Sequence, residues 1–281
     1  EGATVQGRPD EAAAEVAKGL IALKQLRASL PRPQGAAGPG HGDCTCAARN
    51  GGELPYIEGG QMIRKKSLVY ECSPLCRSPL GSVNRVAQRG IRYRLEVFRT
   101  GAQRGWGVRS WDTIPQNTFI CCYLGELLRE NSPSTQQRRD DQYFFALDTA
   151  RACLLATPPG CGEPAGVLEL NGQIRKALES GGEDAANAVQ AADYMIDART
   201  CGNVARFLNH SCAPNCFTQL TFWDHGDMLR PYVCIFSKQS IAPMEELTYD
   251  YGYVVGSVRD ANGVVERPCN CGGEGCRLRL Y

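Results

Sequence analysis

The chain has 281 residues, a length typical of one sizeable domain with small additions. Hydrophobic residues make up 43% and charged residues 22%, so the chain can bury a core of ordinary size. The net charge of +1 argues against a polybasic protein that coats DNA, because non-specific phosphate binding needs clustered positive charge. The longest apolar runs, such as 232–236, are far below the roughly 18 residues of a membrane span, so we expect no membrane association. Because the chain begins with Glu1, we expect it to be part of a longer protein.

Residues 1–42 are predicted to form a helix followed by a linker. Asp10 is a suitable N-cap, and apolar residues recur at helical spacing through 11–30. Pro31 and Pro33 end this helix, and the Gly-, Pro- and Ala-rich stretch up to Gly42 is typical of a linker. We expect the helix to pack on the following domain or on a neighbouring one.

After a loop-rich stretch that extends to residue 84, strand patterns dominate. Residues 91–97 alternate apolar and polar side chains, the period of a half-buried strand. Further strands are expected at 118–123, 143–147, 194–196, 220–223 and 232–236, and Asn262-Gly263 predicts a hairpin turn. Residues 150–190 are rich in Ala, Gly and Glu, with one helical pattern at 174–180, and they are predicted to be a surface insertion. The patterns together indicate a mostly-β domain with short helices.

Fifteen cysteines are present, and most of them lie in tight local groups. Neighbouring cysteines in a CxC pair are too close to bridge each other easily, whereas a turn can direct both sulfurs at one metal ion. This favours structural zinc in a reducing compartment over a disulfide scaffold. The groups are Cys44 with Cys46, Cys72 with Cys76, Cys212 with Cys216, and Cys269 with Cys271 and Cys276. Six others are interpreted as small buried hydrophobes or incidental thiols: Cys121, Cys122, Cys153, Cys161, Cys201 and Cys234.

Five motifs follow one another along about 180 residues. They are RGWG at 104–107, YLGE at 123–126, RFLNHSC with PNC at 206–216, EELTYDYG at 245–252 and CNCGGEGC at 269–276. In this order they resemble the SET-domain protein lysine methyltransferases. The opening CTCA and NGGELPY, the later LVYEC and NRV, and the ending CRLRLY resemble the pre-SET region and post-SET tail of the plant SUVH-type enzymes, a class that methylates lysine 9 of histone H3.

The resemblance implies a SET-domain fold of small curved β-sheets with a knot-like C-terminal crossing. It divides the chain into a helix and linker at 1–42, a degenerate pre-SET region at 43–90, a SET domain at 91–254 with an insertion at about 150–190, and a zinc-binding post-SET tail at 255–281.

The resemblance also implies an active site that uses S-adenosylmethionine. Tyr251 matches the catalytic tyrosine, and Tyr123 and Tyr249 would line the channel for the substrate lysine. A hydroxyl at Tyr249 leaves less room for successive methyl groups, so we expect mono- or dimethylation. The positions that match cofactor-binding residues are Arg104, Gly105, Trp106, Tyr143, Arg206, Asn209 and His210.

Two zinc sites follow from the same resemblance, and they differ in completeness. Cys212, Cys269, Cys271 and Cys276 match the four post-SET ligands. The family packs nine cysteines around three zinc ions in the pre-SET region, but only Cys44, Cys46, Cys72 and Cys76 remain, with Ser78 and Ser82 where further cysteines are expected. Either one tetrahedral zinc ion binds there, or the region folds without metal.

The expected function is that of a nuclear, chromatin-associated enzyme that methylates the tail of histone H3 at lysine 9. The tail is expected to bind as an added strand in a groove between the SET core and the post-SET tail. Direct sequence-specific DNA binding by this segment is not expected. One alternative is a lysine methyltransferase with a non-histone substrate. Another is a catalytically weak chromatin-binding scaffold, against which the intact Tyr251, Asn209 and His210 argue.

Overall fold

The computed structural model describes eleven parts of the chain: 46–74, 76, 78–79, 81–101, 104–129, 143–147, 194–224, 230–253, 259–260, 263–273 and 275–281. The helices predicted at 11–30 and 174–180, the insertion at 150–190 and Cys44 lie outside the described residues. Within them, strands dominate, which confirms the mostly-β prediction. The strands are β1 (Val69–Tyr70), β2 (Leu95–Arg99), β3 (Trp106–Ser110), β4 (Phe119–Tyr123), β5 (Gly125–Arg129), β6 (Phe144–Leu147), β7 (Tyr194–Gly202), β8 (Asn209–His210), β9 (Cys216–Phe222), β10 (Tyr232–Ser237), β11 (Glu246–Tyr249), β12 (Arg259–Asp260) and β13 (Gly263–Val264). Helical structure there is limited to α2 (Cys46–Arg49) and the 3₁₀ turns η1 (Ala87–Arg89) and η2 (Val204–Phe207).

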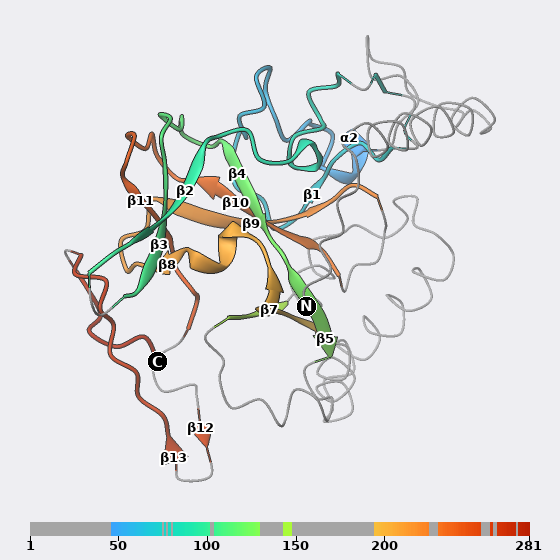
Figure 1. The fold of residues 1–281 in the computed structure, drawn as a ribbon. Helices are drawn as coiled ribbons and strands as arrows, with labels where there is room; N and C mark the ends of the chain where they lie inside the picture. The colour runs from blue at the N-terminus through green and yellow to red at the C-terminus, as the bar shows by residue number, and fades with distance from the viewer. Residues whose placement is uncertain are drawn as a thin grey trace, which may run out of the picture.

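The strands form several small sheets that lie around η2 (Figure 1). Two four-stranded sheets have the orders β1-β9-β10-β4 and β2-β3-β11-β8, and a three-stranded sheet has the order β5-β7-β6. The pair β12-β13 is antiparallel, with Asp260 opposite Gly263, so a hairpin is present as predicted. The predicted turn position was wrong by one residue, because Gly263 is the first residue of β13 and pairs with Asp260. Because no sheet is large, each one contributes only a few residues to the core.

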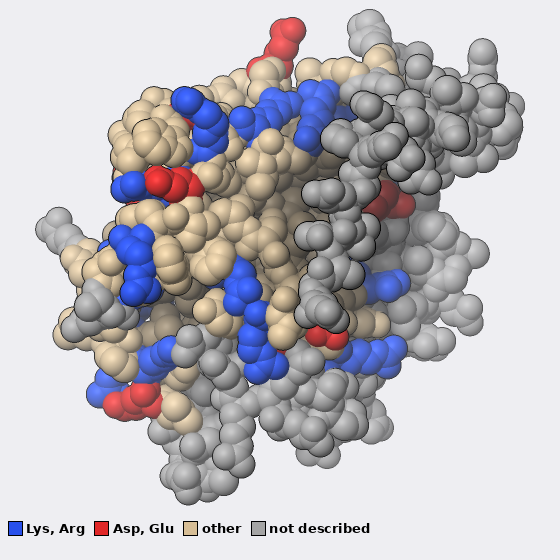
Figure 2. Space-filling view, in the orientation of Figure 1, with Lys and Arg blue, Asp and Glu red and all other residues tan. Residues whose placement is uncertain are grey.

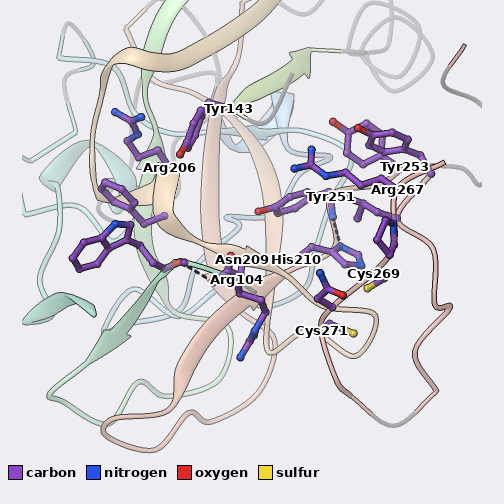
Figure 3. A pocket seen from close by; sticks show the side chains of 17 residues that line it. Arg104, Tyr143, Arg206, Asn209, His210, Tyr251, Tyr253, Arg267, Cys269 and Cys271 are labelled. Carbon is purple, nitrogen blue, oxygen red and sulfur yellow. Dashed lines mark hydrogen bonds between the residues drawn. The ribbon is translucent and has the colours of Figure 1, made fainter. Parts of the chain in front are cut away.

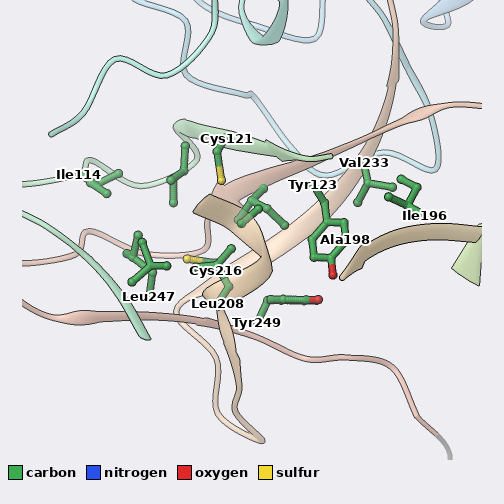
Figure 4. Close-up of a cluster of buried hydrophobic side chains, with 14 of the residues drawn as sticks. Ile114, Cys121, Tyr123, Ile196, Ala198, Leu208, Cys216, Val233, Leu247 and Tyr249 are labelled. Carbon is green, nitrogen blue, oxygen red and sulfur yellow. The ribbon is translucent and has the colours of Figure 1, made fainter. Parts of the chain in front are cut away.

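Strand β10 separates two apolar clusters, which explains why its sequence is apolar throughout rather than alternating. Val233 and Ile235 belong to the larger cluster, which also contains Tyr123 and Tyr249 (Figure 4). Cys234 and Phe236 point to the opposite face, where the second cluster holds the pre-SET residues Tyr56, Met62 and Val69. The predicted pre-SET region therefore covers the back of the sheet whose front carries Tyr123, and Tyr249 of β11 packs in the same cluster on that front side.

A buried carboxylate joins the pre-SET segments. Glu71 is 3% exposed, and its oxygens accept hydrogen bonds from the Tyr56 hydroxyl at 2.9 Å and the Ala87 N–H at 2.7 Å. The N–H groups of Val86 and Gln88 and the Gln88 side-chain amide donate to the same carboxylate. Five donors thus surround one buried charge, which keeps the carboxylate satisfied in an apolar setting.

Segments that are distant in sequence meet beside η2. Strand β8 pairs in parallel with β11, with Asn209 opposite Thr248 and His210 opposite Tyr249. The Ser211 N–H extends the ladder by donating to the Tyr249 carbonyl oxygen at 3.1 Å. This pairing brings two of the sequence motifs into direct contact.

The strand predictions are correct where a neighbouring strand pairs with the predicted segment. Predicted strands at 118–123, 143–147 and 232–236 match β4, β6 and β10 closely, and β7 and β9 are longer than expected. The prediction at 91–97 was wrong at its start, because β3 ends at Ser110 opposite Leu95 and leaves residues 91–94 without a partner strand. Strands β3 and β11 were not predicted, since their residues lie within glycine- and acid-containing motifs.

Charged side chains on the face seen in Figure 2 are dispersed, with acidic residues beside several of the basic ones. This arrangement agrees with the nearly balanced composition. No helix in the described part of the chain has the length and apolar character needed to cross a membrane.

Candidate active site

A cavity of about 510 Å³ lies between the SET core and the C-terminal tail, and all seven predicted cofactor residues line it. They come from four separate segments, and the labelled side chains face a common space in Figure 3. The lining residues are Arg104, Gly105, Trp106, Tyr143, Arg206, Phe207, Asn209, His210, Tyr251, Tyr253, Arg267, Pro268, Cys269, Asn270, Cys271, Leu280 and Tyr281. The structure therefore brings the whole predicted cofactor set together at one place.

A tight turn leads into the Gly-Trp-Gly motif. The Thr100 N–H donates to the Gly105 carbonyl oxygen at 2.9 Å, and Gly105 has a φ of 68°, a conformation that favours glycine. The turn leaves Trp106 47% exposed at the cavity, with the Arg99 guanidinium 4.9 Å from its ring centroid. An exposed tryptophan in a fixed backbone is available to contact a ligand.

Asn209 and His210 are held by hydrogen bonds to neighbouring segments. The Asn209 side-chain amide donates to the Trp106 carbonyl oxygen at 2.9 Å. The His210 Nδ1 accepts from the Tyr251 N–H at 3.2 Å, which places the proton of a neutral ring on Nε2. Burial lowers the pKa of His210, although Asp250 opposes the shift, so the neutral ring is favoured.

Arg206 lies between aromatic rings and lines a second cavity as well as the first. Its guanidinium carbon is 4.5 Å from the Tyr143 ring centroid and 5.3 Å from that of Phe207. Its buried Nε has no hydrogen-bond partner among the described residues.

The second cavity, of about 530 Å³, contains the three predicted catalytic tyrosines and shares a wall with the first. Tyr123, Tyr249 and Tyr251 line it together with Phe145, and the rings form a chain of contacts. The centroids of Tyr123 and Phe145 are 5.4 Å apart, and those of Tyr249 and Tyr251 are 4.9 Å apart. The residues common to both cavities are Arg206, Tyr251 and Tyr253.

The tyrosine hydroxyls in this channel are neutral at physiological pH. Burial raises the pKa of Tyr123, Tyr249 and Tyr251 above the ordinary value, and the neighbouring tyrosines contribute in the same direction. Tyr251 donates its hydroxyl proton to the Leu208 carbonyl oxygen at 2.8 Å, and Tyr123 donates to that of Tyr143 at 2.9 Å. These bonds fix the two hydroxyls, and the three tyrosines give the channel aromatic, uncharged walls, while Arg206 and Asp250 are charged residues that also line the cavity.

Four cysteines at the C-terminal side meet the requirements of a zinc site. The sulfurs of Cys212, Cys269, Cys271 and Cys276 all lie within 4.8 Å of one another. The separation between the sulfurs of Cys212 and Cys269 is 3.7 Å, close to the roughly 3.8 Å expected for thiolates 2.3 Å from a tetrahedral ion. The backbone N–H groups of Arg277 and Leu278 donate to the sulfurs of Cys212 and Cys276 at 3.4 Å, as expected for anionic thiolates. The set of donors fits zinc.

The tail closes one side of the first cavity. Arg267 and the chain end form a short ladder, in which the Arg267 N–H donates to the Tyr281 carbonyl oxygen at 3.0 Å. Tyr281 is only 5% exposed and packs on Tyr253, with ring centroids 4.9 Å apart. Tyr253, Arg267 and Tyr281 were not predicted to be site residues. Tyr281 follows the zinc-ligand motif closely, and this position could have indicated that it lies at the cavity.

In the pre-SET region, the sulfurs of Cys46, Cys72 and Cys76 also lie within 4.8 Å of one another. Cys46 and Cys76 are 3.6 Å apart between sulfurs. The two serines that replace expected cysteines are held by hydrogen bonds: Ser78 accepts from the Arg85 guanidinium at 3.3 Å and Ser82 from the Asn84 N–H at 3.2 Å. The described residues therefore provide three thiols for a metal ion, and the fourth predicted ligand, Cys44, lies outside them.

The grouping of Cys212 with Cys216 was wrong. Cys216 points into the core at 1% exposure, where burial raises its pKa to about 12, so it is a poor metal ligand. Two of the thiols interpreted as structural, Cys121 and Cys234, are buried as expected. Cys201 is exposed and Cys122 half-buried, while Cys153 and Cys161 lie outside the described residues.

The chain is similar to known proteins over most of its length. The chain is 41% identical to the histone-lysine N-methyltransferase, H3 lysine-9 specific SUVH6 of Arabidopsis thaliana, over 85% of this chain and 28% of that protein. It spans well under half of the curated relatives it matches. The crystal structure of Arabidopsis thaliana SUVH6 in complex with SAM aligns with a TM-score of 0.65 and 35% identity, covering 90% of this chain and 49% of that chain.

A second solved structure, KRYPTONITE in complex with mCHH DNA, an H3(1-15) peptide and SAH, has a TM-score of 0.65 and 34% identity, covering 89% of this chain and 43% of that chain. The SET domain family model matches residues 105–252, more than half of the sequence. This match contains the residues that line the two cavities, except Arg104, Tyr253 and those of the tail. The chain belongs to the SET domain family.

Proposed function

We propose that the protein is a protein lysine N-methyltransferase that uses S-adenosylmethionine. The observation that carries the proposal is the shared wall between the two cavities, at which Tyr251 faces both. One cavity is lined by the predicted cofactor residues and the other by aromatic rings suited to a lysine side chain. A methyl group can pass between two such compartments without a covalent enzyme intermediate.

The chemistry requires an unprotonated amine in line with the transferred methyl group. A free lysine has a pKa near 10.4, so roughly one amine in a thousand is the nucleophile at neutral pH, a cost of about 4–5 kcal/mol. The buried aromatic walls formed by Tyr123, Tyr249 and Tyr251 disfavour the ammonium form, because burial penalises the charged state. When bound, S-adenosylmethionine supplies the methyl group from its sulfonium.

The remaining contribution is alignment, which the hydrogen bonds of the channel provide. Tyr251 keeps its hydroxyl fixed through the Leu208 carbonyl oxygen, and its backbone N–H is held by His210. The raised pKa values argue against a tyrosinate base, so water is the expected proton acceptor.

We propose lysine 9 of histone H3 as the acceptor. The supporting observation is the similarity to relatives named as H3 lysine-9 specific and to a structure that contains an H3(1-15) peptide. The protein would then act on chromatin in the nucleus. Because the hydroxyl of the buried Tyr249 lies in the channel wall, mono- and dimethyl-lysine are the proposed products.

We further propose one zinc ion at each cysteine cluster. The C-terminal ion would be held by Cys212, Cys269, Cys271 and Cys276, and the pre-SET ion by Cys46, Cys72 and Cys76 with Cys44. Both ions would be structural, because their ligands would leave no open coordination position.

Transfer from labelled S-adenosylmethionine to an H3(1-15) peptide tests the proposal. Wild-type protein is expected to methylate the peptide but not a version with arginine in place of lysine 9. Tyr251→Phe removes the hydroxyl bonded to Leu208 and is expected to reduce kcat at least about a hundredfold. Tyr232→Phe is the matched control, because its hydroxyl bonds Asp224 and it lines neither cavity.

Two outcomes would contradict this proposal. Cofactor binding without transfer to any histone peptide would favour a non-histone substrate, which a peptide array would identify. A folded protein that binds no cofactor would favour a scaffold.

A further inference from the structure

Glu246, the first residue of β11, has no role in the site described above, yet its carboxylate joins two cofactor-cavity residues. Its Oε1 accepts from the Asn209 side-chain amide at 2.8 Å, and its Oε2 is 2.9 Å from Nη1 of Arg104. The side chains of Glu246 and Arg104 are 17% and 29% exposed. Such a half-buried pair is screened less than a surface ion pair.

The sheet explains why this carboxylate can reach both partners. Strand β11 pairs with β3 on one side, where Glu246 is opposite Arg109, and with β8 on the other, where Thr248 is opposite Asn209. Asn209 also donates to the Trp106 carbonyl oxygen. Glu246 therefore stands where the turn before β3 and the start of β8 meet, and the three segments form one hydrogen-bonded unit.

The second glycine of the Gly-Trp-Gly motif fits the same arrangement. A Cβ atom at Gly107 would lie 2.9 Å from the Glu246 Oε1 and 2.6 Å from Cγ2 of Thr100. The absence of a side chain at Gly107 thus lets the carboxylate lie against the backbone of β3. Gly107 does not have a positive φ, so the backbone conformation does not require glycine there. The requirement comes from packing, because a Cβ would be too close to its neighbours.

We propose that Glu246 is a positioning residue that holds Arg104 and Asn209 in the arrangement that binds the cofactor. The inference rests on the proposed function and deepens it. Through these two residues the carboxylate fixes the opening turn of the cavity relative to β8. It also offsets the positive charge of Arg104 in a cavity proposed to hold a cationic sulfonium.

Two substitutions separate the two contacts. Glu246→Gln keeps an oxygen that can accept from Asn209 but turns an amide toward Arg104, whereas Glu246→Ala removes both contacts. Calorimetric titration with S-adenosylhomocysteine is expected to show a Kd raised about threefold for Glu246→Gln and at least about tenfold for Glu246→Ala. The KM for S-adenosylmethionine should rise in parallel, while kcat at saturating cofactor and the KM for the peptide stay within about twofold.

Glu245→Gln is the matched control. Glu245 is the adjacent residue of the same type, its carboxylate also bonds an asparagine side chain, Asn215 at 2.9 Å, and it lines neither cavity. It is expected to leave the cofactor Kd within about twofold of wild type. In an Arg104→Ala background, Glu246→Gln should lose most of its effect, because its partner is absent.

The results distinguish the inference from the proposed function. If wild type binds the cofactor and folded Glu246→Ala binds it equally well, the positioning role of Glu246 is refuted and the proposed function is not. A change in kcat or peptide KM as large as that in cofactor KM would also refute it, since a general loss of structure would then explain the effect. If Glu246→Ala fails to fold, Glu246→Gln decides by the same criteria. A folded wild-type chain that binds no cofactor refutes both.

Discussion

Loss of the C-terminal zinc ion should open the cofactor cavity, and Cys276→Ser is the substitution that tests this. The tail from residue 267 onward supplies seven of the seventeen lining residues. One of its other links to the core, the ion pair of Arg277 with Asp250, is weak, because the two side chains are 37% and 44% exposed. An exposed pair of this kind contributes at most about 1 kcal/mol, whereas a structural zinc ion contributes about 10–16 kcal/mol.

The magnitude follows from what the tail contributes to the cavity. Releasing it exposes Tyr281 and separates its ring from Tyr253, a contact of about 0.5–1.5 kcal/mol beyond the buried area. Because the cofactor then loses the seven lining residues of the tail, its affinity should fall by more than about 1.4 kcal/mol, which is a tenfold rise in Kd.

The assay combines metal content with cofactor binding. Elemental analysis of wild type should give two zinc ions per chain under the proposal above, and Cys276→Ser should give one. Cys201→Ser is the matched control, because Cys201 is an exposed thiol in neither metal-binding cluster. The reasoning is refuted if Cys276→Ser loses its zinc and still binds S-adenosylhomocysteine with the wild-type Kd.

Two further predictions concern the channel and the pre-SET region. Tyr249→Phe should shift the products toward trimethyl-lysine by removing a hydroxyl from the channel wall; an unchanged product distribution in mass spectra would contradict the role given to that hydroxyl. Glu71→Ala should lower the free energy of unfolding by at least about 3 kcal/mol in denaturant titrations, because five donors, three of them in buried hydrogen bonds, lose their acceptor. Glu53→Ala is the control: the Glu53 side chain is 64% exposed, so this substitution should change the free energy of unfolding by less than about 1 kcal/mol.

The sequence was sufficient to predict features that depend on local chemistry. Cysteine spacing predicted the cluster of Cys269, Cys271 and Cys276, since two sulfurs on one turn can face one ion. Alternating or continuous apolar runs predicted β4, β6 and β10. The motifs, through their resemblance to those of the SET-domain enzymes, predicted seven of the seventeen residues that line the first cavity.

Contacts between distant segments were decided by the tertiary structure. No local pattern shows that Cys216 points into the core while Cys212, four residues earlier, points toward the tail; the direction depends on where β9 begins. Tyr281 and Arg267 became cavity residues only because the tail folds back on itself. The contacts of Glu246 with Arg104 and Asn209 likewise arise from the pairing of β11 with two strands, a long-range arrangement that sequence spacing does not encode.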